Sequence, residues 1–320
     1  MTVALHILIF LVSCLFLAFA GKWLINALLR IAKALCWKEF VVAFFIMAFA
    51  GSLPNFFVGV SAALRGIPEL SFGDVLGGNL ADMTLILALA VLFSKGLPAS
   101  SKTIQTSSIF TLAVAVLPML LILDGTLGRG DGIVLFLFFI MYIVWLFSKD
   151  ERFQKIYDNK SPRPVHKQPK VFLKDFGIIV FGILLILLAA QGIVTSASFF
   201  ADYFVLPLAL IGILIVGLGN CLPEAYFSIV AAKKGEGWLV LGDLMGSIVV
   251  ASTLVLGTVA LINPIVIDNF SPFVIARLFL FIAAFFFLLF VKTGQKVTRK
   301  EAIFLLGIYI TFLIAEVLFH

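Results

Sequence analysis

Runs of about 20 apolar residues recur along the whole chain, and a helix needs a run of that length to cross the hydrocarbon core of a bilayer. Only 12% of the 320 residues are charged, whereas about a quarter of a soluble domain is charged. A soluble fold of this size could not bury so much apolar surface, so lipid has to be the solvent. The hydrophobicity is continuous rather than alternating, which excludes a transmembrane β-barrel. We therefore expect an all-α membrane protein with ten transmembrane helices, at about 3–29, 40–64, 71–94, 103–123, 132–148, 173–201, 204–232, 238–262, 269–291 and 302–318.

The basic residues indicate how these helices are oriented. With the N-terminus outside, most of the 23 Lys and Arg residues fall in the inner connections, and the outer ones hold Arg65, Arg129 and Arg277. Connections rich in Lys and Arg stay on the cytoplasmic side. We therefore predict a multi-pass protein of the cell membrane with both termini outside. The net charge of +6 then reflects topology, and no nucleic-acid partner is expected.

A polar, basic segment divides the chain into two parts with five predicted helices each. We predict a first five-helix repeat at 1–148, a cytoplasmic basic linker at 149–172 and a second five-helix repeat at 173–320. A shift of 169 positions places residues 50–87 over residues 219–256 without a gap. The match depends on shared Pro, Gly and Asp, which align by chance less often than apolar residues: Pro54/Pro223, Gly73/Gly242, Asp74/Asp243 and Gly77/Gly246.

An odd number of helices in each repeat has a geometric consequence. The second copy enters the membrane from the opposite side, so a pseudo-two-fold axis in the membrane plane relates the two copies. Secondary transporters with this plan bind their substrate near the midplane, where the repeats meet.

Acidic residues inside the predicted spans are the first candidates for function, because each costs at least about 2.5–3.5 kcal/mol at the bilayer centre. Asp82 and Glu224 lie well inside their spans, and Asp74 and Asp243 lie nearer the span starts. All four fall within the repeat. Glu316 is set aside, because a carboxylate within a turn of the last helix's end can reach water.

Helix breakers surround these acids. Pro54 and Pro223 lie in the middle of their spans, in Gly51-Ser-Leu-Pro-Asn55 and Asn220-Cys-Leu-Pro-Glu224. Proline removes an amide donor and clashes with the preceding turn, so we expect each span to be two half-helices. Backbone carbonyls at such an interruption can bind a cation.

The polar side chains around the two breaks form a set of oxygen ligands. The predicted site comprises Asn55, Asp82, Glu224 and Ser247 together with the broken-helix carbonyls. Oxygen ligands without paired imidazole or thiolate suit hard cations such as Ca²⁺ and Na⁺. His6, His166 and His320 lie at a helix start, in a loop and at a terminus, so none is a metal-ligand candidate.

At these residues the chain resembles the Ca²⁺/cation antiporter superfamily, which includes the sodium/calcium exchangers. Each repeat of that family has Gly-Thr-Ser-Leu-Pro-Glu, then Gly-Asn-x-x-Gly-Ser-Asn-x-x-Asn/Asp. The first copy here has Gly51-Ser-Leu-Pro-Asn55 and Gly73-Asp-x-x-Gly-Gly-Asn-x-x-Asp82. The second has Asn220-Cys-Leu-Pro-Glu224 and Gly242-Asp-x-x-Gly-Ser-x-x-x-Ala251.

The resemblance implies a ligand for each matched position. The Glu after Pro, the Ser and the last Asn/Asp bind Ca²⁺ and Na⁺ in the family. These positions are Asn55 and Glu224, Gly78 and Ser247, and Asp82 and Ala251. Ser52 and Cys221 occupy a Ser position that also contributes, and Gly51 and Asn220 replace Thr. The resemblance therefore implies a cation site of Asn55, Asp82, Glu224, Ser247, Ser52, Asn220 and Cys221.

The resemblance also implies a function, a secondary active antiporter that exchanges Ca²⁺ for Na⁺ by alternating access. Two carboxylates remain, enough to neutralise one Ca²⁺, two Na⁺ or two H⁺. The expected partners are the lipid bilayer and these ions, with no cofactor apart from transported Ca²⁺ and Na⁺. Two alternatives stay open, an H⁺-coupled or monovalent cation exchanger and a transport-inactive membrane protein of the same fold. No enzyme is expected, because no metal motif or nucleophile–base pair lies at membrane depth.

Several residues have structural interpretations beside the functional ones. Asp74 and Asp243 are expected to cap a helix or lie at an entrance, about 12 Å along the helix from positions 82 and 251. Asn79 is expected to bridge helices, and Asn55 could do the same. Lys22 either extends to the membrane surface or pairs with an acid. Cys14 and Cys36 are expected to be small apolar filler.

Overall fold

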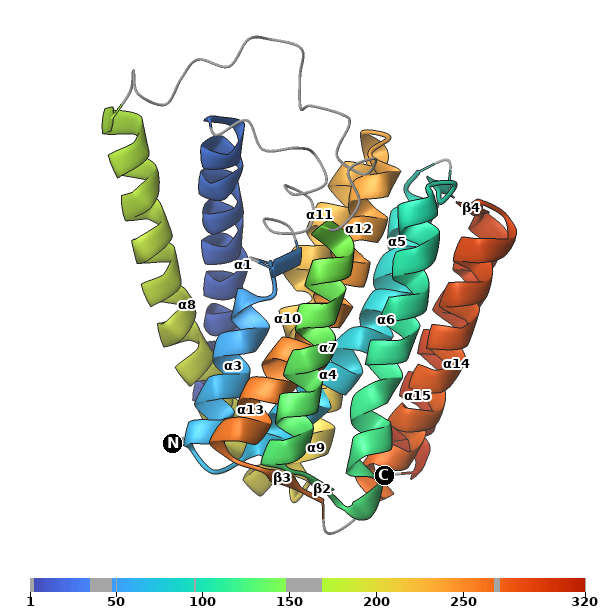
Figure 1. The fold of residues 1–320 in the computed structure, drawn as a ribbon. Helices are drawn as coiled ribbons and strands as arrows, with labels where there is room; N and C mark the ends of the chain where they lie inside the picture. The colour runs from blue at the N-terminus through green and yellow to red at the C-terminus, as the bar shows by residue number, and fades with distance from the viewer. Residues whose placement is uncertain are drawn as a thin grey trace.

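A computed structural model describes residues 3–34, 48–49, 51–94, 96–147, 169–267 and 271–319. Helices fill nearly all of these ranges (Figure 1). Those before residue 148 are α1 (Val3–Ala34), α3 (Leu53–Leu64), α4 (Pro68–Ala81), η2 (Asp82–Ile86), α5 (Leu87–Leu92), α6 (Lys102–Leu121), η3 (Ile122–Asp124) and α7 (Arg129–Phe147). Those after residue 168 are α8 (Pro169–Phe204), α9 (Leu208–Ile211), η6 (Gly212–Val216), α10 (Gly217–Asn220), α11 (Leu222–Lys233), α12 (Gly237–Val249), η7 (Val250–Val255), α13 (Leu256–Ile262), α14 (Ser271–Thr293) and α15 (Arg299–Phe319).

These helices confirm the all-α membrane fold. Eight helical segments in the described residues are long and apolar enough to cross a bilayer. The helix α15 matches the predicted span at 302–318, and α3 covers the second part of the span at 40–64. Because much of 40–52 lies outside the described residues, the count of ten stays a prediction. The division at 149–172 also stays a prediction, since residues 148–168 lie outside the description.

Two short strand pairs link the connections of the two halves. Strand β1 (Leu97–Pro98) pairs antiparallel with β4 (Lys296–Val297), and β2 (Thr126–Leu127) pairs antiparallel with β3 (Ile265–Val266). The 169-residue shift takes β1 to within one residue of β3, and β2 to within one residue of β4. The two pairs lie at opposite ends of the helices (Figure 1). One pair is therefore the inverted counterpart of the other, as the predicted repeat requires.

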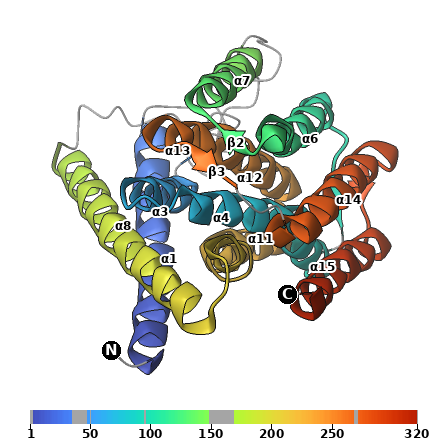
Figure 2. The same cartoon turned by 90° about the horizontal axis from the view of Figure 1, so that it is seen from below.

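The helices that carry the acids form the centre of the molecule. In the span Pro68–Leu92, 83% of the most apolar 18-residue stretch is buried inside the protein. The corresponding share is 78% in Gly237–Ile262 and 28% in Val3–Leu24. Seen along the helices, α4 and α11 lie in the middle, between the α1–α8 pair and the α14–α15 pair (Figure 2). A buried polar residue on α4, α11 or α12 is thus shielded from lipid by other helices.

Both chain ends lie at one end of the molecule, and α7 ends and α8 begins at the other (Figure 1). This agrees with the predicted placement of the termini on one side of the membrane and the linker on the other. Which side is cytoplasmic stays a prediction.

Candidate cation-binding site

Each proline-containing span has an interruption of a single residue. The turn residue is Ser52 before α3 and Cys221 between α10 and α11, and each is followed by proline in the first turn of the next helix. The backbone angles are nearly identical, φ −80° and ψ −2° at Ser52 and φ −79° and ψ −5° at Cys221. Both carbonyls still accept helical hydrogen bonds, from Phe56 and Ala225. In the second copy the half-helices α10 and α11 therefore meet at one turn residue, with no unwound stretch between them, whereas most of the segment before Ser52 lies outside the described residues.

Glycines bring α4 unusually close to the segment 208–220 of the other half. A Cβ at Gly73 or Gly77 would overlap the backbone carbonyl of Ala209 or Ile213, and a Cβ at Gly217 would lie 2.8 Å from the Gly78 nitrogen. Only glycine permits backbones to approach so closely. This contact aligns α4 with the kink at Cys221, whose thiol donates to the Gly78 carbonyl at 3.7 Å.

Asp74 is buried inside α4 and pairs with the other half. The Asn220 amide nitrogen lies 3.0 Å from each Asp74 carboxylate oxygen. Helix α4 has Ile67 as its N-cap residue and α12 has Glu236, so the capping role predicted for Asp74 and Asp243 is wrong. Sequence reasoning placed the two aspartates by their distance along one helix, whereas the contact that binds Asp74 comes from the opposite half.

The second group of polar side chains surrounds Asp82. The Cys221 thiol and the Ser247 hydroxyl lie within hydrogen-bonding reach of its carboxylate. Ser52 donates to the Ala48 carbonyl at 2.7 Å and lies 3.4 Å from the Ser247 hydroxyl. The Glu224 carboxylate is near enough to Asp82 for the two negative charges to repel. Residues of η2, α11 and α12 and the two turn residues Ser52 and Cys221 thus meet at one place.

Four oxygen atoms of the predicted ligands are buried and have no hydrogen-bond partner among the described residues. They belong to four of the seven predicted residues, Asn55 (Oδ1), Asp82 (Oδ1), Asn220 (Oδ1) and Glu224 (Oε2). None of the four residues is more than 6% exposed. An unsatisfied buried polar atom costs about 1–3 kcal/mol, and more where the group is charged. A cation would satisfy such oxygens and offset the repulsion between the two carboxylates.

A cluster of protein metal ligands is absent from the part of the chain described here, where no three His, Cys, Asp or Glu side chains are placed to hold a metal ion. A cation at this place would therefore bind to two carboxylates and to neutral amide, hydroxyl and carbonyl oxygens. Such a set suits a hard cation that retains part of its hydration shell.

Sequence reasoning missed the π-helical turns beside the site. The turn η2 begins at Asp82, and η7 begins at Val250, one residue before the repeat counterpart Ala251. Thr84 donates to the Leu80 carbonyl, and Thr253 donates to the Val249 carbonyl at 2.5 Å. Such wide turns often occur at functional sites. The pair Thr84/Thr253, identical in both copies, was the signal available in the sequence.

The remaining candidates have structural roles or lie away from the site. Asn79 donates to Ser252 at 2.7 Å, which confirms the predicted bridge between helices. Lys22 lies exposed, with Nζ 5.4 Å from the centre of the Tyr226 ring, and pairs with no acid among the described residues.

Glu316 is only 1% exposed, so the prediction that it reaches water is wrong. His6 stacks on Phe199 between α1 and α8. Cys14 is buried as expected, while Cys36, His166 and His320 lie outside the described residues.

Comparison with known proteins shows that the chain is similar to membrane exchangers. The family model described as sodium/calcium exchanger protein matches residues 5–148 and 174–318. The chain is 25% identical to the sodium/calcium exchanger MaX1 of Methanosarcina acetivorans, over 99% of both chains. It is 28% identical to the putative antiporter CaxA of Alkalimonas amylolytica, over 81% of both.

Solved structures give the same result for the fold. The sodium-calcium exchanger NCX_Mj, soaked with 10 mM Na⁺ and 10 mM Sr²⁺, is 25% identical to this chain. The two superpose with a TM-score of 0.69, and the match covers 98% of this chain and 99% of the other.

Proposed function

Because the chain belongs to the sodium/calcium exchanger family, we propose that it is a secondary active cation antiporter that exchanges Ca²⁺ for Na⁺. The cations bind at one site shared by the two repeats and reach it from one side of the membrane at a time. The observation that carries this proposal is the four buried oxygens, contributed by both halves, that have no hydrogen-bond partner in the described part of the chain.

The residues divide into two kinds of ligand. Asp82 and Glu224 supply the negative charge that draws a cation out of water. Asn55, Asn220, Ser52 and Ser247 supply neutral oxygens that replace its hydration shell. Cys221 lies beside the Asp82 carboxylate, and its thiol donates to the Gly78 carbonyl. The ions are the cargo, and we propose no resident cofactor and no enzymatic activity.

The charge of the site sets the proposed stoichiometry. Two carboxylates neutralise one Ca²⁺ or two Na⁺, whereas a third Na⁺ would leave excess positive charge in a medium of low dielectric constant. We therefore propose two Na⁺ for each Ca²⁺, an exchange that moves no net charge. We further propose that both termini face outward and that the segment 149–172 is cytoplasmic.

Calcium uptake by proteoliposomes tests the proposal. Proteoliposomes that contain the wild-type protein and are loaded with Na⁺ should take up ⁴⁵Ca²⁺ when the outer solution lacks Na⁺. Glu224→Gln and Asp82→Asn should each lower the rate of uptake at least about 100-fold, since the loss of a charge inside the membrane costs several kcal/mol. Asp202→Asn is the matched control, because Asp202 is exposed near the end of α8. Absence of flux in wild type with all ions tested would refute the transporter.

An imposed membrane potential tests the stoichiometry in the same vesicles. A two-to-one exchange should be insensitive to the potential. Uptake that depends on the membrane potential, as expected for the exchange of three Na⁺ for one Ca²⁺, would contradict the two-to-one stoichiometry. Calcium uptake that follows a pH gradient and ignores Na⁺ would favour the H⁺-coupled alternative.

A further inference from the structure

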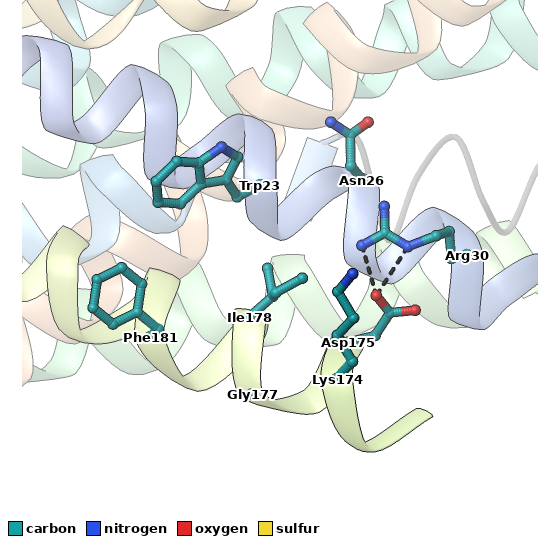
Figure 3. Close-up of a pocket in the computed structure, with 8 residues that line it drawn as sticks. All are labelled: Trp23, Asn26, Arg30, Lys174, Asp175, Gly177, Ile178 and Phe181. Atoms are coloured by element: carbon teal, nitrogen blue, oxygen red, sulfur yellow. Dashed lines mark hydrogen bonds and ion pairs between the residues drawn. The ribbon is translucent and has the colours of Figure 1, made fainter. Parts of the chain in front are cut away.

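A cavity of about 830 Å³ lies between α1 and α8, away from the proposed cation site. Among the described residues its lining comes from these two helices and includes Trp23, Arg30, Lys174, Asp175 and Phe181 (Figure 3). Arg30 and Lys174 lie at the ends of the apolar spans predicted at 3–29 and 173–201. The cavity therefore lies where the hydrocarbon core gives way to the polar surface, at the end of the molecule that we propose to be cytoplasmic.

The polar part of the cavity has an excess of positive charge. Arg30 donates from Nε and Nη2 to one oxygen of the buried Asp175, at 2.9 Å and 2.6 Å (Figure 3). The Arg30 side chain is 48% exposed, and its Nη1 takes no part in this ion pair. Lys174, next to Asp175 in sequence, is exposed and adds a second cation. Two cations thus face one carboxylate, and the carboxylate fixes the guanidinium in position.

The apolar part of the cavity continues into the lipid-facing surface. Trp23 and Phe181 stack with their ring centres 6.3 Å apart, one from each helix. Aromatic residues concentrate at this level of the bilayer. Beyond them both helices expose large apolar side chains, which include Leu15, Phe16 and Phe19 on α1 and Val180, Leu184 and Leu188 on α8.

We propose that this cavity binds an anionic phospholipid. The phosphate of the headgroup contacts Arg30 Nη1 and Lys174, the glycerol lies against Trp23 and Phe181, and the acyl chains follow the exposed faces of α1 and α8. Charge complementarity selects an anionic over a zwitterionic headgroup, since basic pockets between transmembrane helices bind acidic lipids. The apolar continuation selects a lipid over a free phosphate ion.

Native mass spectrometry of the full-length protein tests this site with phosphatidylglycerol as the probe. Wild type should retain phosphatidylglycerol in preference to phosphatidylcholine, and glycerol phosphate should not compete. Lys174→Glu should weaken retention at least about tenfold, because one attraction near the membrane surface is lost and one repulsion is gained. Arg30→Gln/Asp175→Asn should weaken it too. This double variant removes the guanidinium without leaving an unpaired buried carboxylate and keeps the net charge.

The control is Lys300→Glu, the same charge reversal at an exposed residue in the first turn of α15. Equal retention of the two lipids by wild type would overturn the proposal, as would equal weakening by Lys174→Glu and Lys300→Glu. Competition by glycerol phosphate would show a simple anion site and would overturn it as well. Antiport does not enter this measurement, so failure of the lipid site leaves the proposed function untouched.

Discussion

The two copies of the repeat share their backbone but not their ligands. Both have a one-residue turn shortly before a proline. Both also have a π-helical turn, which begins five residues after Gly77 in the first copy and four residues after Gly246 in the second. The side chains at matching positions differ: Asn55 against Glu224, Asp82 against Ala251, and Gly78 against Ser247. Each copy supplies one carboxylate from a different position. The backbone arrangement is thus the same in both copies, while the proposed site needs side chains from both copies to be complete.

The same difference extends to the aspartates that the copies share. Asp74 receives the Asn220 amide, whereas the residue that corresponds to Asn220 in the first copy is Gly51, which has no side chain to offer Asp243. One aspartate is therefore held across the interface and its counterpart is not held in that way. Symmetry in sequence does not ensure symmetry in hydrogen bonding.

The largest effect is expected where the two halves approach most closely. Gly77→Ala should abolish recovery of folded protein, because the new Cβ overlaps the Ile213 carbonyl and backbone cannot move aside as a flexible side chain can. Gly307→Ala is the control, since a Cβ there meets nothing within 4 Å. The control should be neutral or more stable by up to about 1 kcal/mol. Gel filtration and thermal unfolding in detergent measure both, and normal unfolding of Gly77→Ala would show that this contact can relax.

The sequence could predict the fold because the constraint is simple and repeated. Apolar length gave the spans, and Pro, Gly and Asp in register gave the repeat. The kinks at Ser52 and Cys221 followed from the prolines after them. What could not be predicted depends on how helices face one another. The bond from Asn220 to Asp74 and the burial of Glu316 both arise from packing between segments that are distant in sequence.

A second effect is expected from restoring an acid that the first copy lacks. Asn55→Glu adds a third carboxylate to the proposed site, so one more monovalent cation can be held without excess charge. The exchange should change from potential-insensitive to potential-dependent, with about one more Na⁺ moved per Ca²⁺. Flux at several imposed potentials measures this change. Asn55→Gln keeps an amide on a side chain of similar length and should leave the stoichiometry unchanged, and an equal response of both variants would contradict the charge argument.

A smaller effect is expected from the hydrogen bond that only one copy makes. Asn220→Ala leaves Asp74 buried without its partner, which should lower the free energy of unfolding by about 1–3 kcal/mol. Asp74→Ala/Asn220→Ala removes both groups and should cost less than the sum of the single variants. Thermal unfolding of the four proteins gives the coupling energy. Strict additivity would mean that the bond contributes nothing.

The smallest effect is expected at Lys22, which the 169-residue shift places on Gln191. Gln191 donates to Ser61 at 3.1 Å, while Lys22 is exposed with its Nζ 5.4 Å from the centre of the Tyr226 ring. Lys22→Gln gives the first copy the side chain of the second. It should leave calcium flux within about twofold of wild type, because an exposed cation–π contact contributes about 0.5–1 kcal/mol. A tenfold or greater change in flux would mean that Lys22 acts as a substitute cation for the site, and the two copies would then differ in charge as well as in ligands.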